Sequence, residues 1–188
     1  MNSDSYLKNQ FLIAMPGLQD PNFHRTVTYI CEHSAEGAMG IVVNRPMNLH
    51  LRDILEQMQI PPTAEAAVDQ IVFSGGPVAT DRGFVLHSGG KHWESTLEIA
   101  PEICITTSRD ILESMARGLG PPQSLIALGY AGWSSGQLEE EMRQNAWLSG
   151  PSDAEIMFHL PVEARWRAAA RLLGIQNLDT IGTAAGHA

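Results

Sequence analysis

Short apolar runs closed by glycine or proline turns are the feature that most constrains how this chain can fold. Three such runs, rich in β-branched and aromatic residues, lie close together at residues 11–15, 26–33 and 39–44. The spacers between them, 16–25 and 34–38, are shorter than the crossover of about a dozen residues or more that joins parallel strands. The runs therefore predict neighbouring antiparallel strands.

Further strand-like runs alternate with amphipathic segments along the rest of the chain. Strands bounded by glycine, proline or polar turns are predicted at 70–74, 83–87, 96–100, 102–106 and 124–130. Helical spacing predicts helices over 51–58, 108–119, 136–145 and 161–173. In the second of these, Ile111, Leu112, Met115 and Leu119 share one face.

This alternation predicts an α/β fold, a single-domain α/β sandwich with a mixed, largely antiparallel sheet flanked by helices. The domain is expected to span residues 11–175. Residues 1–10 are expected to form a flexible N-terminus, and residues 176–188 a C-terminal tail.

Composition indicates an ordinary globular protein. Hydrophobic residues make up 44% of the 188 residues and charged residues 18%, which excludes a disordered or low-complexity chain. The two cysteines, Cys31 and Cys104, have no Cys-x-x-Cys spacing and are expected to be buried thiols in a reducing compartment. No apolar run approaches the roughly 20 residues of a membrane span, and the start lacks a signal-peptide pattern. We expect a cytoplasmic protein that does not bind membranes.

Charge argues against direct binding to nucleic acid. The net charge is −9, and the acidic excess is spread along the chain without a basic block. Arg165, Arg167 and Arg171 in the last predicted helix are the best local cluster, but no helix-turn-helix precedes them. We expect these arginines to form a solvated helix face.

Gly132-Trp133-Ser134-Ser135-Gly136 matches the Gly-x-Ser-x-Gly nucleophile elbow, and it lies between a predicted strand and a predicted helix. A triad order exists with Asp153 and His159, or with Asp179 and His187. The alternative is a helix cap, because Ser134 stands three residues before Gln137, as in a capping box. Both interpretations remain open from the residues alone.

The histidines and glycine-rich stretches lack the spacing of metal or nucleotide sites. Seven histidines form neither His-x-His nor His-Glu-x-x-His, and no glycine-rich stretch has the phosphate-loop pattern. We expect no metal and no cofactor.

Arginines next to turn residues are the remaining candidates for binding. They occur in His24-Arg25-Thr26, Asn44-Arg45-Pro46 and Asp81-Arg82-Gly83. A guanidinium there either pairs with a neighbouring carboxylate, as Asp81 suggests for Arg82, or binds an anionic group of a ligand or partner. Trp133, between glycines in a predicted turn, is expected to be partly exposed.

These motifs together resemble the AlgH/YqgE family of bacterial proteins. The resemblance covers about residues 11–175 and rests on segments 15–27, 37–46, 75–78, 82–87, 106–110, 128–139, Trp147 and 165–166. It implies a cytosolic α/β sandwich with a regulatory name from alginate genetics and no established activity, cofactor or DNA contact. In the family pattern the two positions after Trp133 are open, which argues against a nucleophile at Ser134.

The functional hypothesis is a non-catalytic cytosolic regulatory protein that acts indirectly, by binding an unknown protein or small-molecule partner. It is expected to be a monomer or weak oligomer. The alternative function is a serine hydrolase with Ser134 as the nucleophile. Ordered turns with polar and aromatic residues serve binding more often than packing. The binding surface is therefore predicted on the turns that carry Arg25, Asn44, Arg45, Arg82, His87 and Trp133.

Overall fold

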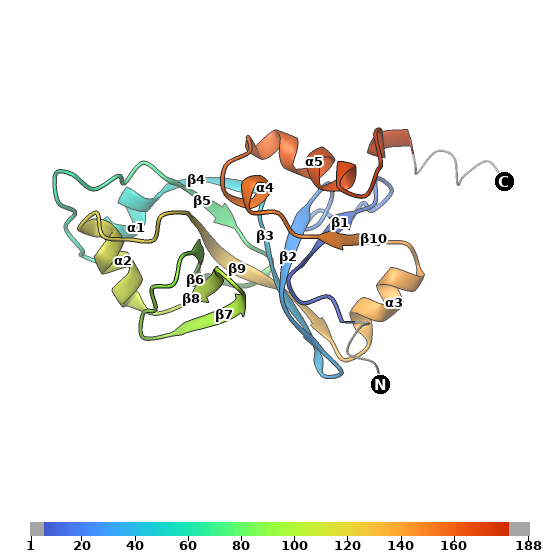
Figure 1. The fold of residues 1–188 in the computed structure, drawn as a ribbon, viewed down its shortest axis with the longest axis horizontal. Coiled ribbons are helices and arrows are strands. Elements are labelled where there is room, and N and C mark those ends of the chain that lie inside the picture. Colours follow the sequence, from blue (N-terminus) through green and yellow to red (C-terminus); the bar gives the residue numbers. More distant parts are fainter. Residues whose placement is uncertain (1–5, 181–188) are drawn as a thin grey trace.

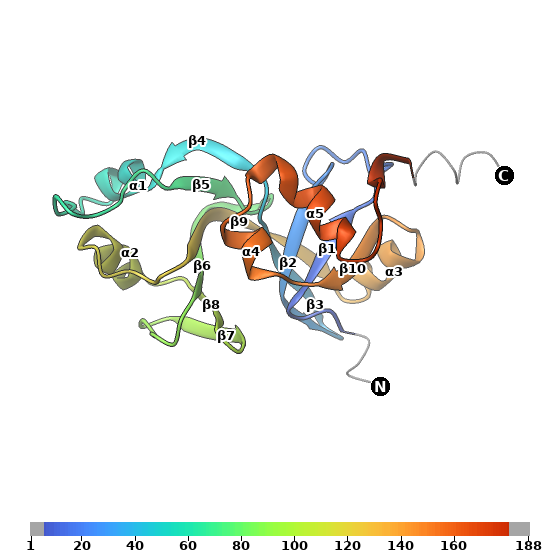
Figure 2. The ribbon, with the colours of Figure 1, turned by 45° about the horizontal axis from the view of Figure 1, so that its top comes forward.

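A computed structural model describes residues 6–180, in which ten strands form one mixed sheet (Figures 1 and 2). The strands are β1 (Gln10–Ala14), β2 (Val27–Ser34), β3 (Gly37–Val42), β4 (Pro46–His50), β5 (Ile71–Ser74), β6 (Val78–Ser88), β7 (Thr96–Ala100), β8 (Ile103–Thr106), β9 (Ser124–Ser134) and β10 (Trp147–Pro151). The helices are α1 (Leu51–Gln57), α2 (Arg109–Ala116), α3 (Gln137–Arg143), α4 (Ala154–Phe158) and α5 (Arg165–Arg171), with short 3₁₀ turns η2 (Val162–Ala164) and η3 (Leu178–Thr180).

Strand β9 is the central strand of the sheet and pairs with β3, β5 and β6. The main strand order is β10-β1-β2-β3-β9-β6-β8-β7. Outside this path, β5 pairs with β9, and β4 pairs with β5. The β5–β9 pair is parallel, while the other ladders are antiparallel. The predicted mixed, largely antiparallel sheet flanked by helices is confirmed.

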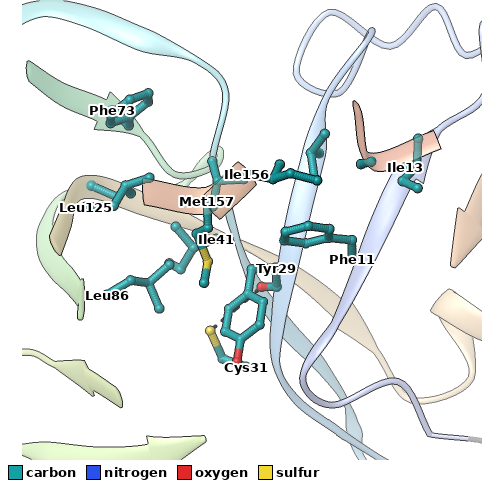
Figure 3. Packing of buried hydrophobic residues seen from close by; sticks show 14 of the residues in the cluster. Phe11, Ile13, Tyr29, Cys31, Ile41, Phe73, Leu86, Leu125, Ile156 and Met157 are labelled. Atoms are coloured by element: carbon teal, nitrogen blue, oxygen red, sulfur yellow. Dashed lines mark hydrogen bonds between the residues drawn. The ribbon is translucent and has the colours of Figure 1, made fainter. Parts of the chain in front are cut away.

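Strand β1 is an uninterrupted apolar run because both of its faces are buried. It lies between β10 and β2, and its side chains alternate between two buried layers. Phe11 and Ile13 pack into the main core cluster, where Phe11 meets Tyr29 edge to face at 6.3 Å (Figure 3). Leu12 and Ala14 point the other way, into a cluster built around tryptophans.

Helices cover the sheet in three places. α5 lies over β1 and β2, α4 packs beside it against β9, and α3 packs near β9 and β10 (Figures 1 and 2). In the other half of the molecule, Leu51 and Leu55 of α1 and Ile111 of α2 pack on Val72 and Ile126 of the sheet. No helix within residues 6–180 is long and apolar enough to cross a membrane.

Several boundaries differ from the sequence prediction. β4, β10 and α4 were not predicted: β4 and β10 are short strands that contain proline, and α4 has five residues. β6 begins at Val78 instead of residue 83, and β9 continues to Ser134 instead of ending at residue 130. Leu119 lies beyond the end of α2 and is 58% exposed, so its predicted place on the buried helix face is wrong.

The two ends of the chain are only partly described. Of the N-terminus predicted to be flexible, residues 6–10 contact β2 through the Leu7 N–H, which donates to His33 Nδ1, and the Asn9 N–H, which donates to Ile30 O. Of the predicted C-terminal tail, residues 178–180 form η3. Residues 1–5 and 181–188 lie outside the described part.

Both cysteines are free and buried, as predicted. Burial raises the pKa of the Cys31 and Cys104 thiols above the ordinary value, so neither is a thiolate at neutral pH.

Candidate functional site

The structure places the six predicted site residues in three separate regions. Arg25, Asn44 and Arg45 meet at the loop that precedes β2, Arg82 and Trp133 border a groove on the sheet, and His87 lies in the interior. The single surface predicted from the sequence does not form.

Asn44 and Arg45 hold the 20–26 loop in place. The Asn44 side chain accepts a hydrogen bond from the Val27 N–H and donates one to the Arg25 carbonyl, both at 2.9 Å. The Arg45 guanidinium donates to the carbonyls of Pro21 and His24. These bonds keep Arg25 at φ 57°, a left-handed conformation that is uncommon outside glycine.

The Arg25 side chain leaves this loop and meets the C-terminal part of the domain. Its guanidinium lies 4.7 Å from the ring centroid of Trp166 and forms an ion pair with Asp179. Asp179 also accepts a hydrogen bond from Arg167 at 2.8 Å. The bond from Arg167, together with the charge of Arg25, lowers the pKa of the Asp179 carboxyl.

An open groove of about 820 Å³ crosses the sheet face where β3, β9 and β6 meet. It is lined by Lys8, Glu32, His33, Ser34, Glu36, Gly37, Ala38, Met39, Val78, Arg82, Phe84, Tyr130, Gly132 and Trp133. Gly132 is paired with Met39 across the β3–β9 ladder, and a Cβ at Gly132 would meet Tyr130 and Val78 side chains at 3.4 and 3.8 Å. The groove is therefore deeper at Gly132, because no side chain rises from the strand at that position.

Arg82 is a cation of this groove that has no carboxylate partner among the described residues. Its guanidinium lies 5.2 Å from the ring centroid of Phe84. Among residues 6–180, no carboxylate forms an ion pair with it, so the expected pairing with Asp81 is absent. A guanidinium on an aromatic face in an open groove can bind an anionic group.

Trp133 is 5% exposed, so its predicted partial exposure is wrong. Because β9 continues through residue 133, its side chains keep alternating, and the indole points away from Gly132 and the groove. The ring stacks on Phe23 at 6.0 Å and meets Trp147 edge to face at 6.0 Å. Trp133 is therefore a core residue whose strand borders the groove.

His87 lies in β6, paired with Cys104 of β8, and is fully buried, which contradicts its predicted place on a surface turn. The Trp93 N–H donates to the Thr96 hydroxyl, which is hydrogen-bonded to the Thr106 hydroxyl at 2.7 Å. The Thr106 hydroxyl is in turn hydrogen-bonded to His87 Nε2 at 2.7 Å. Burial lowers the pKa of His87, which favours the neutral imidazole.

The His87 environment predicts a loss of stability in mild acid. In the unfolded chain the pKa of a histidine is about 6.5, and the folded pKa lies below it. The unfolded state therefore binds more protons below pH ~6.5, and the free energy of unfolding falls as pH drops through that value. In urea unfolding at pH 7.5, 6.5 and 5.5, the stability advantage of wild type over His87→Gln should shrink stepwise. His24→Gln, at an exposed site, should leave this dependence unchanged, and a pH-independent difference for His87→Gln would contradict the account.

The proposed triad of Ser134, Asp153 and His159 is not assembled. The Ser134 hydroxyl donates to Gln137 Oε1 at 3.2 Å, and Asp153 accepts from the Ile156 N–H at 3.0 Å. His159 bonds instead to Gln123. In the second combination, Asp179 is bound to two arginines, and His187 lies outside the described residues.

The capping interpretation of Ser134 holds in part. The Gln137 side chain reaches back to the Ser134 N–H at 2.9 Å, as in half of a capping box. The residue at the N-cap of α3 is nevertheless Gly136, with φ 76°, and not Ser134.

Arg165 was predicted on a solvated face, but it is 5% exposed. Its guanidinium donates to the carbonyls of Val43 at 2.7 Å and Leu160 at 2.9 Å, and it lies 5.3 Å from the ring centroid of Phe73. Burial lowers the pKa of Arg165. The sequence held no signal for this, because Val43 lies just after β3, 122 residues earlier in the chain, and Leu160 lies in the turn before η2.

Metal binding has no support in the part of the chain that the structure describes. There, no three His, Cys, Asp or Glu side chains come close enough together to hold a metal ion.

Comparison with known proteins gives one consistent family. A family model described as AlgH-like (DUF179) matches residues 11–178. A UPF0301 protein of Saccharophagus degradans is 58% identical over 97% of this chain and 89% of its own length. A UPF0301 protein of Thioalkalivibrio sulfidiphilus is 56% identical over the whole of both chains.

Two solved structures share the fold. The solution structure of the AlgH protein from Pseudomonas aeruginosa superposes with a TM-score of 0.80 at 52% identity, covering 100% of this chain and 99% of that one. The crystal structure of protein DIP2367 from Corynebacterium diphtheriae gives 0.72 at 16% identity over 95% and 93%, a likeness of fold alone. The sequence matches and the shared fold show that this chain belongs to the AlgH-like family.

Proposed function

We propose that the protein is a non-catalytic cytoplasmic regulatory protein that binds a protein or small-molecule partner in the groove between β3, β9 and β6. The observation that carries the proposal is Arg82, which lies in an open groove on the ring of Phe84 with no carboxylate partner among the described residues. The partner is expected to present an anionic group to Arg82 and apolar surface to Phe84, Tyr130 and Met39.

A serine hydrolase is the competing function, and the Ser134 contacts do not favour it. A nucleophilic serine needs a base within hydrogen-bond reach, whereas the Ser134 hydroxyl bonds to the Gln137 amide oxygen. We therefore expect no labelling by a serine-directed fluorophosphonate. Labelling of wild type that disappears in Ser134→Ala would favour the enzyme over the binding protein.

Site-specific photo-crosslinking in living cells tests the groove directly. A p-benzoylphenylalanine at position 132 projects from the groove floor, where the nearest atoms to a Cβ belong to side chains. The same group at Leu172, exposed at the end of α5, serves as the matched control. After irradiation, intact-mass measurement and peptide mapping identify what is attached at each position.

The expected result is a defined adduct at position 132 that is absent at position 172. Adding Arg82→Ala should abolish the adduct, because the anionic group loses its counter-charge. Failure to form an adduct at 132, or formation of the same adduct with Arg82→Ala, would contradict the proposed function.

A further inference from the structure

We propose that Arg25, Trp166 and Arg167 form a second binding site, for a peptide carboxylate, which the chain's own Leu178-Asp179 occupies. A partner protein that offers an apolar residue followed by Asp or Glu would bind there by displacing residues 176–180. This site uses none of the residues that line the β3–β9–β6 groove, so the inference stands apart from the proposed function.

The geometry of the site matches one carboxylate. Asp179 Oδ1 pairs with Arg25, and Oδ2 accepts from Arg167 at 2.8 Å, so each oxygen has its own guanidinium. Both guanidinium groups lie over Trp166, at 4.7 and 5.9 Å from the ring centroid. Two cations gathered at one indole repel each other unless an anion lies between them, and a carboxylate has two oxygens to offer.

The walls of the site are held by bonds that do not involve Asp179. The Asn44 amide donates to the Arg25 carbonyl at 2.9 Å, which fixes the loop. The Trp166 indole N–H donates to the buried Ala14 carbonyl at 2.9 Å, and neighbouring Arg165 donates to Val43 at 2.7 Å. We therefore expect the Arg25 backbone and the Trp166 indole to stay in place when the Asp179 carboxylate is removed, so that both guanidinium groups remain within reach of an incoming carboxylate.

The occupying segment has one apolar anchor and one charged anchor. Its apolar anchor is Leu178, which is 2% exposed and packs into the main core cluster. Its charged anchor is Asp179, whose pairs with Arg25 and Arg167 are partly exposed to solvent. Exposed ion pairs contribute little to stability and are screened by salt. The Leu-Asp pair thus defines the ligand class, and it can be exchanged for a similar pair from another chain.

A peptide-binding measurement on the full chain tests the site. The probe is a fluorescein-labelled peptide with the sequence of residues 175–183, Ile-Gln-Asn-Leu-Asp-Thr-Ile-Gly-Thr. Fluorescence anisotropy compares wild type with Asp179→Asn and with Leu178→Ser/Asp179→Asn, in which the internal ligand is weakened. Asp69→Asn is the matched control, because Asp69 forms an exposed ion pair with Arg52 elsewhere on the surface.

The expected order of affinity is the double variant first, then Asp179→Asn, then wild type and Asp69→Asn equally weak. Replacing Asp by Asn in the peptide should weaken binding to the double variant about tenfold, the factor expected for a lost charge-assisted contact. Adding Arg25→Gln or Arg167→Gln should weaken it by a similar factor. Inorganic phosphate, which has charge but no apolar residue, should compete poorly.

The Trp166 indole N–H resonance, assigned with Trp166→Phe, reports in every variant whether the walls remain intact. If the double variant loses this signal, the comparison rests on Asp179→Asn alone. An intact signal without peptide binding, equal binding of the Asn peptide, or binding that survives both arginine substitutions would overturn the proposal. Competition by phosphate as strong as by unlabelled peptide would also overturn it, because the site would then recognise any anion.

Discussion

Gly76→Ala should destabilise the fold by about 3 kcal/mol, which combines backbone strain with an overpacked contact. Gly76 has φ 149°, a backbone conformation that side-chain-bearing residues rarely adopt. A Cβ there would lie 2.1 Å from the Tyr130 carbonyl carbon and 2.2 Å from its oxygen. Both atoms belong to the β9 backbone, which is fixed on two sides by β3 and β6 and cannot move away cheaply.

The matched control for this substitution is Gly83→Ala, within the neighbouring strand β6. A Cβ at Gly83 would meet nothing within 4 Å, so the change in the free energy of unfolding should stay within about 0.5 kcal/mol. Urea unfolding followed by circular dichroism measures both variants. Equal stabilities for the two would show that β9 does not constrain the turn at Gly76.

Arg165→Met should cost about 3 kcal/mol, because each buried carbonyl left without a donor costs about 1–3 kcal/mol. The substitution removes the donors to Val43 and Leu160 and the contact with Phe73, while the methionine fills part of the space. The same urea titration measures the loss.

Arg171→Met at the exposed end of the same helix is its control. It should change stability by less than about 0.5 kcal/mol, as surface substitutions usually do. If Arg165→Met proved as mild as Arg171→Met, the bonds of the Arg165 guanidinium would not contribute to holding α5 in place.

The predictable parts of this fold are those whose signal is local. The apolar run of β1 and the spacing of Ile111 and Met115 in α2 could be recognised because burial repeats along a few residues. Trp133 was assigned to a turn because glycines flank it. In the structure, residues 131–134 instead pair with β3, where Trp133 is opposite Ala38, so β9 remains a strand up to Ser134.

The candidate sites depend on pairings between distant segments, which a sequence pattern does not contain. The groove floor arises because Gly132 faces Met39 across a ladder that joins residues far apart in the chain. His87 is internal because β6 lies between β8 and β9, and no local feature distinguished it from an exposed histidine. The turn arginines were predicted to share one binding surface, but Arg45 holds a loop whereas Arg82 lies in the groove.

The most direct test of the binding groove is NMR of protein labelled with ¹³C-methyl methionine, in which Met39 lines the groove and Met47 is exposed elsewhere. The labelled protein is mixed with a native lysate of cells that lack it. We expect the Met39 methyl resonance to shift or broaden in wild type but not in Arg82→Ala, while Met47 stays unchanged in both. A Met39 resonance that is unaffected by lysate, or is affected equally in Arg82→Ala, would contradict binding in this groove.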